Sequence, residues 1–192
     1  MRIVGGVHRG LKLAEVGEGD AAAHLRPTSD RVREAVFNLL EGGRFGAPVE
    51  GARVLDLFAG TGALSLEALS RGAAEAVLVE DGRVGQRLIR ENLRLARREA
   101  QVRVLAQDAT RLPANTGEPF TLCFLDPPYG KGFGTKALAA ALAGGWLAPG
   151  AVVVWEEAGP MMPLPGTGLL DRRTYGGTVV TLLRVDQAQA RS

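Results

Sequence analysis

From residue 51 onward, short apolar runs alternate with segments whose apolar residues recur every three to four positions. The runs have the length of strands, and the spacing between them is that of amphipathic helices. Strands are expected to end near Phe58, Glu80, Leu105 and Leu125, with a further strand at residues 151–156 and helices at residues 63–70, 83–99 and 134–146. This alternation predicts right-handed crossovers and a mostly parallel sheet covered on both faces, which is a doubly wound α/β fold.

The two ends of the chain depart from this alternation. Residues 1–13 contain a glycine pair and a further glycine and predict a short hairpin. A helix is expected at residues 31–41, for which Thr28, Ser29 and Asp30 are candidate N-caps. At the other end, residues 169–175 and 178–185 flank a Gly-Gly pair and predict an antiparallel hairpin. The stretch 159–166 is rich in Pro and Met and is not expected to form a full helix.

The sequence Asp126-Pro127-Pro128-Tyr129 directly follows the apolar run at residues 120–125. Two prolines end a strand because neither can donate to the ladder. A carboxylate, a rigid turn and an aromatic ring are therefore placed where ligands bind in an open α/β sheet. These groups suit a planar molecule with an amino group, which stacks on Tyr129 and donates N–H bonds to Asp126 and the Pro127 carbonyl. A strand-ending turn with a surface tyrosine is the alternative interpretation.

A glycine-rich turn at residues 59–63 joins the first predicted strand of the sheet to the helix that follows. Strand, turn and helix in this order are typical of nucleotide binding, because glycines allow close approach and the helix end presents free N–H groups. A dinucleotide fingerprint would place a third Gly or Ala at Ser65 and would lack Asp56 at the strand end. An acid there favours a ligand with a cationic amino-acid end. Glu80 ends the next strand, where a ribose offers two hydroxyls.

The composition is that of an ordinary soluble globular protein, with 46% hydrophobic and 23% charged residues among 192. The one cysteine, Cys123, falls in a predicted buried strand, which fits a reducing cytoplasm and excludes an internal disulfide. His8 and His24 are too few and too isolated for a zinc site, so no metal is expected. We expect no membrane span and no signal peptide, and hence a cytoplasmic protein.

The net charge is only +2, so the placement of basic residues matters more than their number. A basic cluster precedes the α/β core, and the helix after the second strand carries arginines at spacings of three and four. We interpret the arginine stripe as a solvated helix face on the nucleotide side, and the cluster as the better candidate for nucleic-acid contact. The cluster contains Arg2, His8, Arg9, Lys12, Arg26, Arg31 and Arg33, and the stripe contains Arg83, Arg87, Arg90, Arg94 and Arg97.

Together these motifs resemble those of class I S-adenosylmethionine (SAM)-dependent methyltransferases. The Asp-Pro-Pro-Tyr sequence resembles that of enzymes that methylate exocyclic amines of nucleobases. The bacterial RsmD family is similar over nearly the whole chain, from residue 2 to about residue 185, with residues 26–34 as the most family-specific part. The other segments that carry this resemblance are residues 3–6, 9–13, 56–64 and 67–72.

The resemblance implies methyl transfer from SAM to the N2 amine of a guanine in the 16S ribosomal RNA of the small subunit. The RNA partner is expected within a small subunit or an assembly intermediate. The implied fold is a Rossmann-like domain at residues 46–188, with a mostly parallel sheet and a terminal antiparallel hairpin. Residues 1–45 are expected to form an extension, a small β-hairpin and a helix, that binds RNA and closes over the cofactor.

The resemblance also implies the cofactor residues, of which the spacing alone supports only Gly60, Gly62 and Glu80. The catalytic group would be Asp126, Pro127, Pro128 and Tyr129. SAM would contact Asp56, Phe58, Ala59, Gly60, Gly62, Glu80, Asp81, Asp108, Ala109, Arg26 and Thr28. The candidate RNA contacts come instead from the basic cluster and from the loop after Asp-Pro-Pro-Tyr, whose alternative interpretation is a plain linker; they are Arg9, Lys12, Arg31, Lys131 and Phe133.

Two alternatives remain open at this stage. An adenine-N6 methyltransferase acting on DNA or other RNA would use the same chemistry, but the sequence offers no separate target-recognition region. The second is a nicotinamide-dependent oxidoreductase or a nucleotide-binding module without catalysis. The missing third glycine and the Asp-Pro-Pro-Tyr sequence argue against it.

Overall fold

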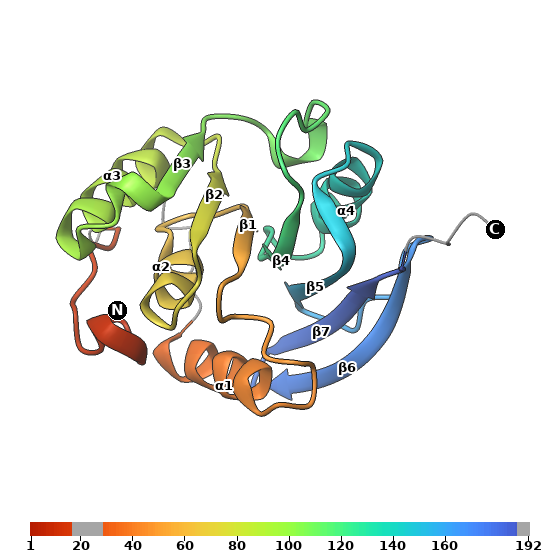
Figure 1. Cartoon of the computed structure of the whole chain (residues 1–192), viewed down its shortest axis with the longest axis horizontal. Coiled ribbons are helices and arrows are strands. Elements are labelled where there is room, and N and C mark those ends of the chain that lie inside the picture. The colour runs from red at the N-terminus through yellow and green to blue at the C-terminus, as the bar shows by residue number, and fades with distance from the viewer. Residues whose placement is uncertain (17–28, 188–192) are drawn as a thin grey trace.

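Seven strands form one sheet in the computed structural model, which describes residues 1–16 and 29–187 (Figure 1). The strands are β1 (Arg53–Leu57), β2 (Glu75–Val79), β3 (Val102–Leu105), β4 (Phe120–Leu125), β5 (Leu147–Glu157), β6 (Thr167–Tyr175) and β7 (Thr178–Val185). Their order across the sheet is β3-β2-β1-β4-β5-β7-β6. The strands from β3 to β5 run parallel, whereas β7 pairs antiparallel with β5 and β6. The predicted α/β fold with a terminal antiparallel hairpin is confirmed.

Helices cover both faces of this sheet and bury an apolar cluster on each. The helices are α1 (Asp30–Glu41), α2 (Ala63–Ser70), α3 (Arg83–Ala96) and α4 (Phe133–Ala143), with 3-10 turns at Gly6–His8, Glu99–Gln101 and Ala109–Arg111. On one face Phe37 of α1, Leu69 of α2 and Ile89 of α3 join the cluster around Phe124 of β4. On the other face, Leu138 of α4 is fully buried. None of the helices in the described parts of the chain is long and apolar enough to cross a membrane.

Two helices end earlier than their sequence patterns predict. The helix α3 stops at Ala96 because Arg97 adopts a left-handed conformation with φ of 54°, so its backbone leaves the helical path. The helix α4 stops at Ala143, before a glycine pair whose second member, Gly145, has φ of 69°. Trp146 lies beyond that turn and leads into β5, which begins four residues before the predicted start.

The amino-terminal segment is less regular than the predicted hairpin. Its two ends meet in one antiparallel bridge, between Arg2 and Lys12, around the 3-10 turn. Ile3 and Leu13 are buried in the same cluster as α1, so the described part of the extension shares the core of the sheet domain. The division of the chain at residues 45 and 46 therefore stays a prediction. Of the candidate N-caps of α1, Ser29 accepts from the backbone N–H of Val32 at 3.3 Å.

Candidate active site

A cavity of about 1140 Å³ lies at the carboxyl ends of the central parallel strands. It spans the boundary between β1 and β4, where the strand order reverses and where α/β sheets bind ligands. Its walls come from the loops after β1, β2 and β4 and from the turn between β6 and β7. Ser29 and Val32 at the start of α1 also line the cavity. The cavity thus lies at the edge of the sheet where the sequence predicts the site.

Four of the carboxylates that line this cavity come from four neighbouring strands. In order across the sheet they are Glu80 after β2, Asp56 in β1, Asp126 after β4 and Glu156 in β5. Adjacent strands lie about 4.8 Å apart, so the four form a row along the edge of the sheet. A row of acidic groups suits ligands that carry positive charge or several N–H and O–H donors.

Asp56 is almost fully buried. The Ser65 hydroxyl donates to its Oδ2 at 2.7 Å, which gives a structural reason for a serine where a dinucleotide fingerprint has a glycine or alanine. Burial raises the pKa of Asp56 to about 7, and the nearby charges of Asp126 and Glu80 add to this rise. A cation bound beside Asp56 would favour its ionised form.

Glu80 holds the two glycine-containing loops together. Its Oε2 accepts from the Gly60 N–H and its Oε1 from the Gly82 N–H, both at 2.8 Å. A Cβ atom at Gly82 or Gly85 would lie within 2.8 Å of a Glu80 side-chain atom, so both positions need glycine for this carboxylate to fit. Phe58 has φ of 66° in the loop after β1. A bulky residue in that region is a conformational outlier of the kind that clusters at functional sites.

The loop that contains Asp126, Pro127, Pro128 and Tyr129 is anchored at both ends, and all four residues line the cavity. The Asp126 N–H is 3.5 Å from the Leu57 carbonyl, which continues the pairing of β4 with β1. After the turn, the Gly130 N–H donates to Glu157 at 2.9 Å. The Tyr129 hydroxyl lies 3.3 Å from that of Thr178 in β7. These contacts hold the ring in place while leaving it 39% exposed.

Tyr129 stays a neutral phenol across the physiological range. Burial raises its pKa to about 12; the Thr178 hydrogen bond opposes this rise, whereas the charges of Asp126, Glu156 and Glu157 add to it. An uncharged aromatic ring at the cavity wall suits stacking against a base rather than proton transfer.

The remaining expected cofactor residues are only partly brought together. Ala59, Gly60, Asp81 and Ala109 line the cavity with Phe58. Gly62, with φ of 77°, is absent from the lining and instead shapes the turn, since a Cβ there would lie 3.1 Å from Leu78.

Asp108 is one of the expected cofactor residues but does not line the cavity. Its carboxylate accepts from the Thr110 N–H at 2.8 Å and caps the 3-10 turn, so it lies outside the lining and its neighbour Gln107 lies within it. The pKa of Asp108 is lowered mainly by the hydrogen bonds from Thr110. Arg26 and Thr28 fall outside the described residues.

The candidate RNA residues are similarly divided. Lys131 is exposed and lines the cavity, whereas Phe133 begins α4 and lies outside the lining. Arg31 is exposed on α1, and Arg9 and Lys12 are exposed on the amino-terminal segment. Of these five candidates, only Lys131 lines the cavity.

Several lining residues escaped the sequence reasoning. Glu156 ends a predicted strand just as Glu80 does, so the same argument would have found it. Tyr175 and Thr178 lie about fifty residues beyond Asp126 and reach the cavity only through the β6–β7 hairpin. No local signal in the sequence indicates such a distant contact.

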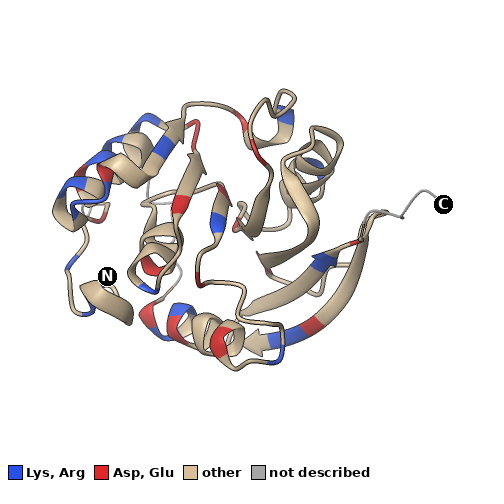
Figure 2. Ribbon diagram, in the orientation of Figure 1, with Lys and Arg blue, Asp and Glu red and all other residues tan. Residues whose placement is uncertain are grey.

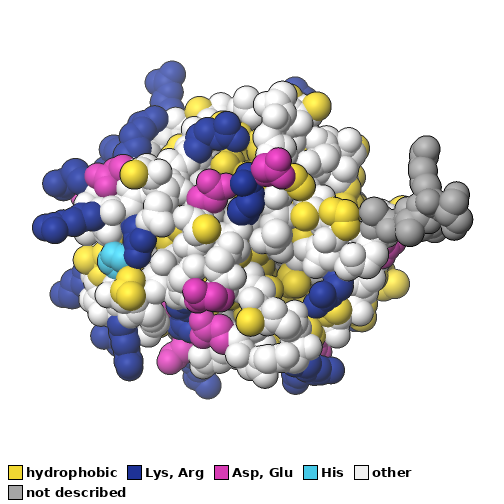
Figure 3. Space-filling view, in the orientation of Figure 1, with side chains coloured by type: hydrophobic (Ala, Val, Ile, Leu, Met, Phe, Trp, Pro, Cys, Tyr) yellow, Lys and Arg dark blue, Asp and Glu magenta, His cyan; other side chains and the backbone are white. Residues whose placement is uncertain are grey.

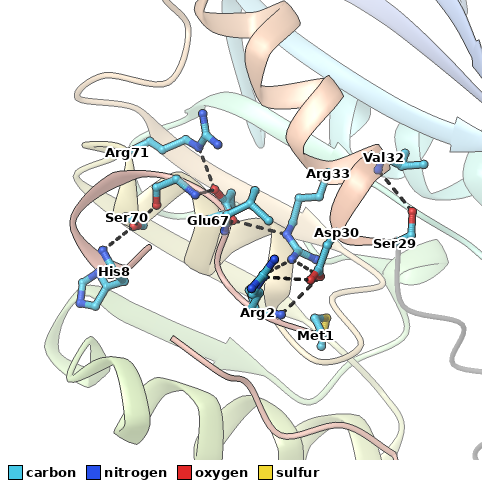
Figure 4. Close-up of polar contacts among 12 residues, drawn as sticks. Met1, Arg2, His8, Ser29, Asp30, Val32, Arg33, Glu67, Ser70 and Arg71 are labelled. Atoms are coloured by element: carbon cyan, nitrogen blue, oxygen red, sulfur yellow. Dashed lines mark hydrogen bonds and ion pairs between the residues drawn. The ribbon is translucent and has the colours of Figure 1, made fainter. Parts of the chain in front are cut away.

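The family-specific amino-terminal segments meet in a buried polar network (Figure 4). The Glu67 carboxylate of α2 accepts from the backbone N–H groups of Val4 and Gly5 at 2.8 and 2.7 Å. It also accepts from Arg33 of α1 at 3.4 Å and from Arg71 at 2.8 Å. Arg33 is fully buried, so its assignment to the solvent-facing basic cluster is wrong. The network fixes the extension and α1 to α2, beside the cavity.

The arginine stripe and the amino-terminal segment are neighbours (Figure 2). The Asn92 side chain of α3 exchanges two hydrogen bonds with the backbone of Ala14, at 2.7 and 3.2 Å. All five stripe arginines are exposed, as predicted. Dark blue side chains therefore gather along the edge formed by α3 and the amino-terminal segment (Figure 3). The exposed residues of the amino-terminal segment and the arginine stripe thus lie on one edge, because the extension packs against α3.

His8 adds little charge to this edge. Partial burial lowers its pKa, the charge of Arg98 lowers it further, and a hydrogen bond with the backbone of Ala96 opposes them. The basic character of the edge comes from Arg and Lys side chains.

Comparison with known proteins places the chain among methyltransferases. A family model described as "Conserved hypothetical protein 95" matches residues 1–184. Ribosomal RNA small subunit methyltransferase D of Escherichia coli K12 is 39% identical over 196 aligned positions, covering all of this chain and 93% of that protein. Its Haemophilus influenzae counterpart is 32% identical, over 92% of this chain and 89% of that protein.

The solved structures agree with the sequence relatives. The Escherichia coli protein yhhF has a TM-score of 0.82 at 34% identity, covering 98% of this chain and 99% of that one. The chain thus has the fold of the class I methyltransferases. The chain belongs to the RsmD family of methyltransferases.

Proposed function

We propose that this protein transfers a methyl group from SAM to the exocyclic N2 amine of a guanine in 16S ribosomal RNA. The observation that carries the proposal is the anchored Asp126–Tyr129 turn, which presents a carboxylate, a carbonyl and a neutral aromatic ring to the cavity. The names of the relatives, which act on small-subunit ribosomal RNA, support the choice of substrate.

The cavity fits SAM on the chemistry of its walls. Glu80 lies at the end of β2 between two loops, in the position that suits the ribose hydroxyls of a nucleoside. Asp56 and the Gly60 loop offer an anionic and close-fitting end for the methionine part, and Ala109 gives an apolar wall for adenine. When bound, SAM supplies an electrophilic methyl group.

The residues of the turn then have separate roles on the base. The N2 lone pair of guanine is delocalised into the ring, so the amine is a weak nucleophile. Asp126 and the Pro127 carbonyl accept its two N–H bonds, which orients the lone pair and stabilises the positive charge that develops on nitrogen. Tyr129 stacks on the base, a contact worth roughly 1–3 kcal/mol. Because the methylated ammonium is strongly acidic, its proton leaves without a dedicated strong base.

A base within an RNA helix must leave the stack to enter this cavity, unless it is already looped out. The basic edge formed by α3 and the amino-terminal segment offers phosphate contacts that hold the surrounding RNA. Lys131 lies on the cavity rim, where it suits a phosphate next to the extruded base. The partner we propose is 16S ribosomal RNA in a small subunit or an assembly intermediate, within the cytoplasm.

Labelled SAM and four substrates test this proposal. These are naked small-subunit RNA, assembled small subunits, duplex DNA and transfer RNA. We expect label in the small-subunit RNA, free or assembled, and N2-methylguanosine after digestion. Label in duplex DNA, or N6-methyladenosine as the product, would instead support the adenine-N6 alternative. Binding of NAD in place of SAM would overturn the assignment as a methyltransferase.

A further inference from the structure

Glu156 is a carboxylate in the cavity that the chemistry described above leaves without a role. It lies in β5, one residue beyond Trp155, which pairs with Leu125 of β4. Since β4 and β5 are parallel, Glu156 lies beside Asp126, with neighbouring strands about 4.8 Å apart. It also pairs with Val180 of β7, so its backbone is held by the sheet. Its side chain is only 1% exposed, yet it lines the cavity.

The negative charge of Glu156 acts on Tyr129, in the turn that receives the base. It adds to the rise in the pKa of Tyr129, and both side chains line the same cavity. Glu157, the next residue, has a different role, because its carboxylate accepts from the Gly130 and Ala158 N–H groups and lies outside the lining. The two adjacent glutamates thus divide into one that holds the loop and one at the cavity wall.

Guanine and adenine differ at the ring nitrogen next to the amine. In guanine, N1 carries a hydrogen, so N1 and the N2 amine present two adjacent donors, with the O6 acceptor on the other side of N1. In adenine, the N1 beside the N6 amine is an acceptor, and a lone pair facing a carboxylate is repelled. When Asp126 and the Pro127 carbonyl accept from the amine, a carboxylate beside Asp126, such as that of Glu156, would face N1.

We infer that Glu156 accepts the N1–H of the target guanine and thereby makes the site specific for guanine over adenine. The inference rests on the proposed function and adds to it the residue that recognises the base. A buried acceptor that is left facing a lone pair penalises the wrong base more strongly than a lost surface contact does. Glu156 is therefore a specificity residue, whereas Asp126 acts on the reacting amine.

The test compares guanine with 2-aminopurine, which keeps the 2-amino group but has an acceptor at N1. The methylated guanine is first mapped with the wild-type protein and unmodified small-subunit RNA. RNA with 2-aminopurine at that position is then prepared by ligation and, where needed, assembled into subunits. The ratio of kcat/KM for guanine to that for 2-aminopurine is measured for the wild type, Glu156→Gln and Glu156→Ala. Intrinsic differences between the two amines are common to all variants and cancel.

We expect both substitutions to lower this ratio by roughly 10- to 150-fold, the range for a hydrogen bond to a charged group. Glu157→Gln is the matched control, and it should change the rates on both bases by one factor and keep the ratio. A wild-type ratio in either Glu156 variant that binds SAM normally overturns the inference while leaving the proposed function intact. Absence of N2-methylguanosine with wild-type protein and unmodified RNA overturns both.

Discussion

Replacing Glu67 with alanine should destabilise the protein more than any loss of a surface charge. The Glu67 carboxylate is fully buried and accepts four hydrogen bonds, two from the backbone of the amino-terminal segment and two from arginines. Glu67→Ala leaves Arg33 buried, with its ion pair to Glu67 lost. Breaking a buried pair on one side costs about 3–5 kcal/mol.

For a chain of this size, each kcal/mol lowers Tm by about 2–4 °C, so the variant should melt roughly 6–20 °C below the wild type. Affinity for SAM should fall as well, because Ser29 and Val32 line the cavity at the start of α1, which Arg33 holds in place. Urea unfolding followed by circular dichroism gives the free energy of unfolding, and calorimetry gives the affinity for SAM.

Glu41→Gln is the matched control for this variant. Glu41 also accepts from Arg71, at 2.6 Å, but its side chain is 41% exposed, so the loss should stay below about 1 kcal/mol. If Glu67→Ala is destabilised by no more than Glu41→Gln, the polar network does not fix the extension to the sheet domain, and our account of the family-specific segments is refuted.

Three further predictions concern the cofactor, the buried acid and the RNA. Glu80→Ala should weaken SAM binding at least tenfold, by calorimetry, and unchanged affinity would remove Glu80 from the cofactor site. The pKa of Asp56 is raised from 3.8 to about 7, so the group lowers stability progressively as the pH rises from about 4 to about 7, by a total on the order of 4 kcal/mol. Asp56→Asn should remove this fall in urea unfolding at pH 5 and pH 8, and an unchanged pH profile would contradict the assigned pKa. Arg9→Glu with Lys12→Glu should raise the KM for RNA at constant SAM affinity and flatten the salt dependence of filter binding, and Arg90→Glu should do the same because both lie on one edge. Unchanged RNA binding by Arg90→Glu would instead support the interpretation from the sequence, in which the arginine stripe of α3 is a solvated helix face.

The succession of strands and helices along the chain, and the acids that follow two of the strands, are predictable from the sequence because both depend on local patterns. An apolar run followed by Glu80 or Asp126 indicates a strand end independently of the rest of the chain. The boundaries of α3 depend instead on one residue, Arg97, in a left-handed conformation that few sequences signal. Helical spacing continues past that point, so the pattern predicts a longer helix.

Contacts between distant segments are the part that sequence reasoning could not supply. Arg33 looks like a surface cation in the sequence, and only its packing against Glu67 shows that it is buried. The contact between α3 and the extension depends on Asn92, and no local pattern in the sequence distinguishes this residue. Tyr175 and Thr178 likewise enter the cavity through the pairing of β6 with β7.

The most direct test of the central claim is the rate at which Asp126→Ala forms N2-methylguanosine, measured by mass spectrometry of digested small-subunit RNA. The claim is that the anchored turn presents a guanine amine for methyl transfer. We predict a rate roughly 10²–10³-fold below that of the wild type, the loss typical of one positioned transition-state contact, with SAM affinity nearly unchanged. Wild-type rates of N2-methylguanosine formation in Asp126→Ala would contradict the claim.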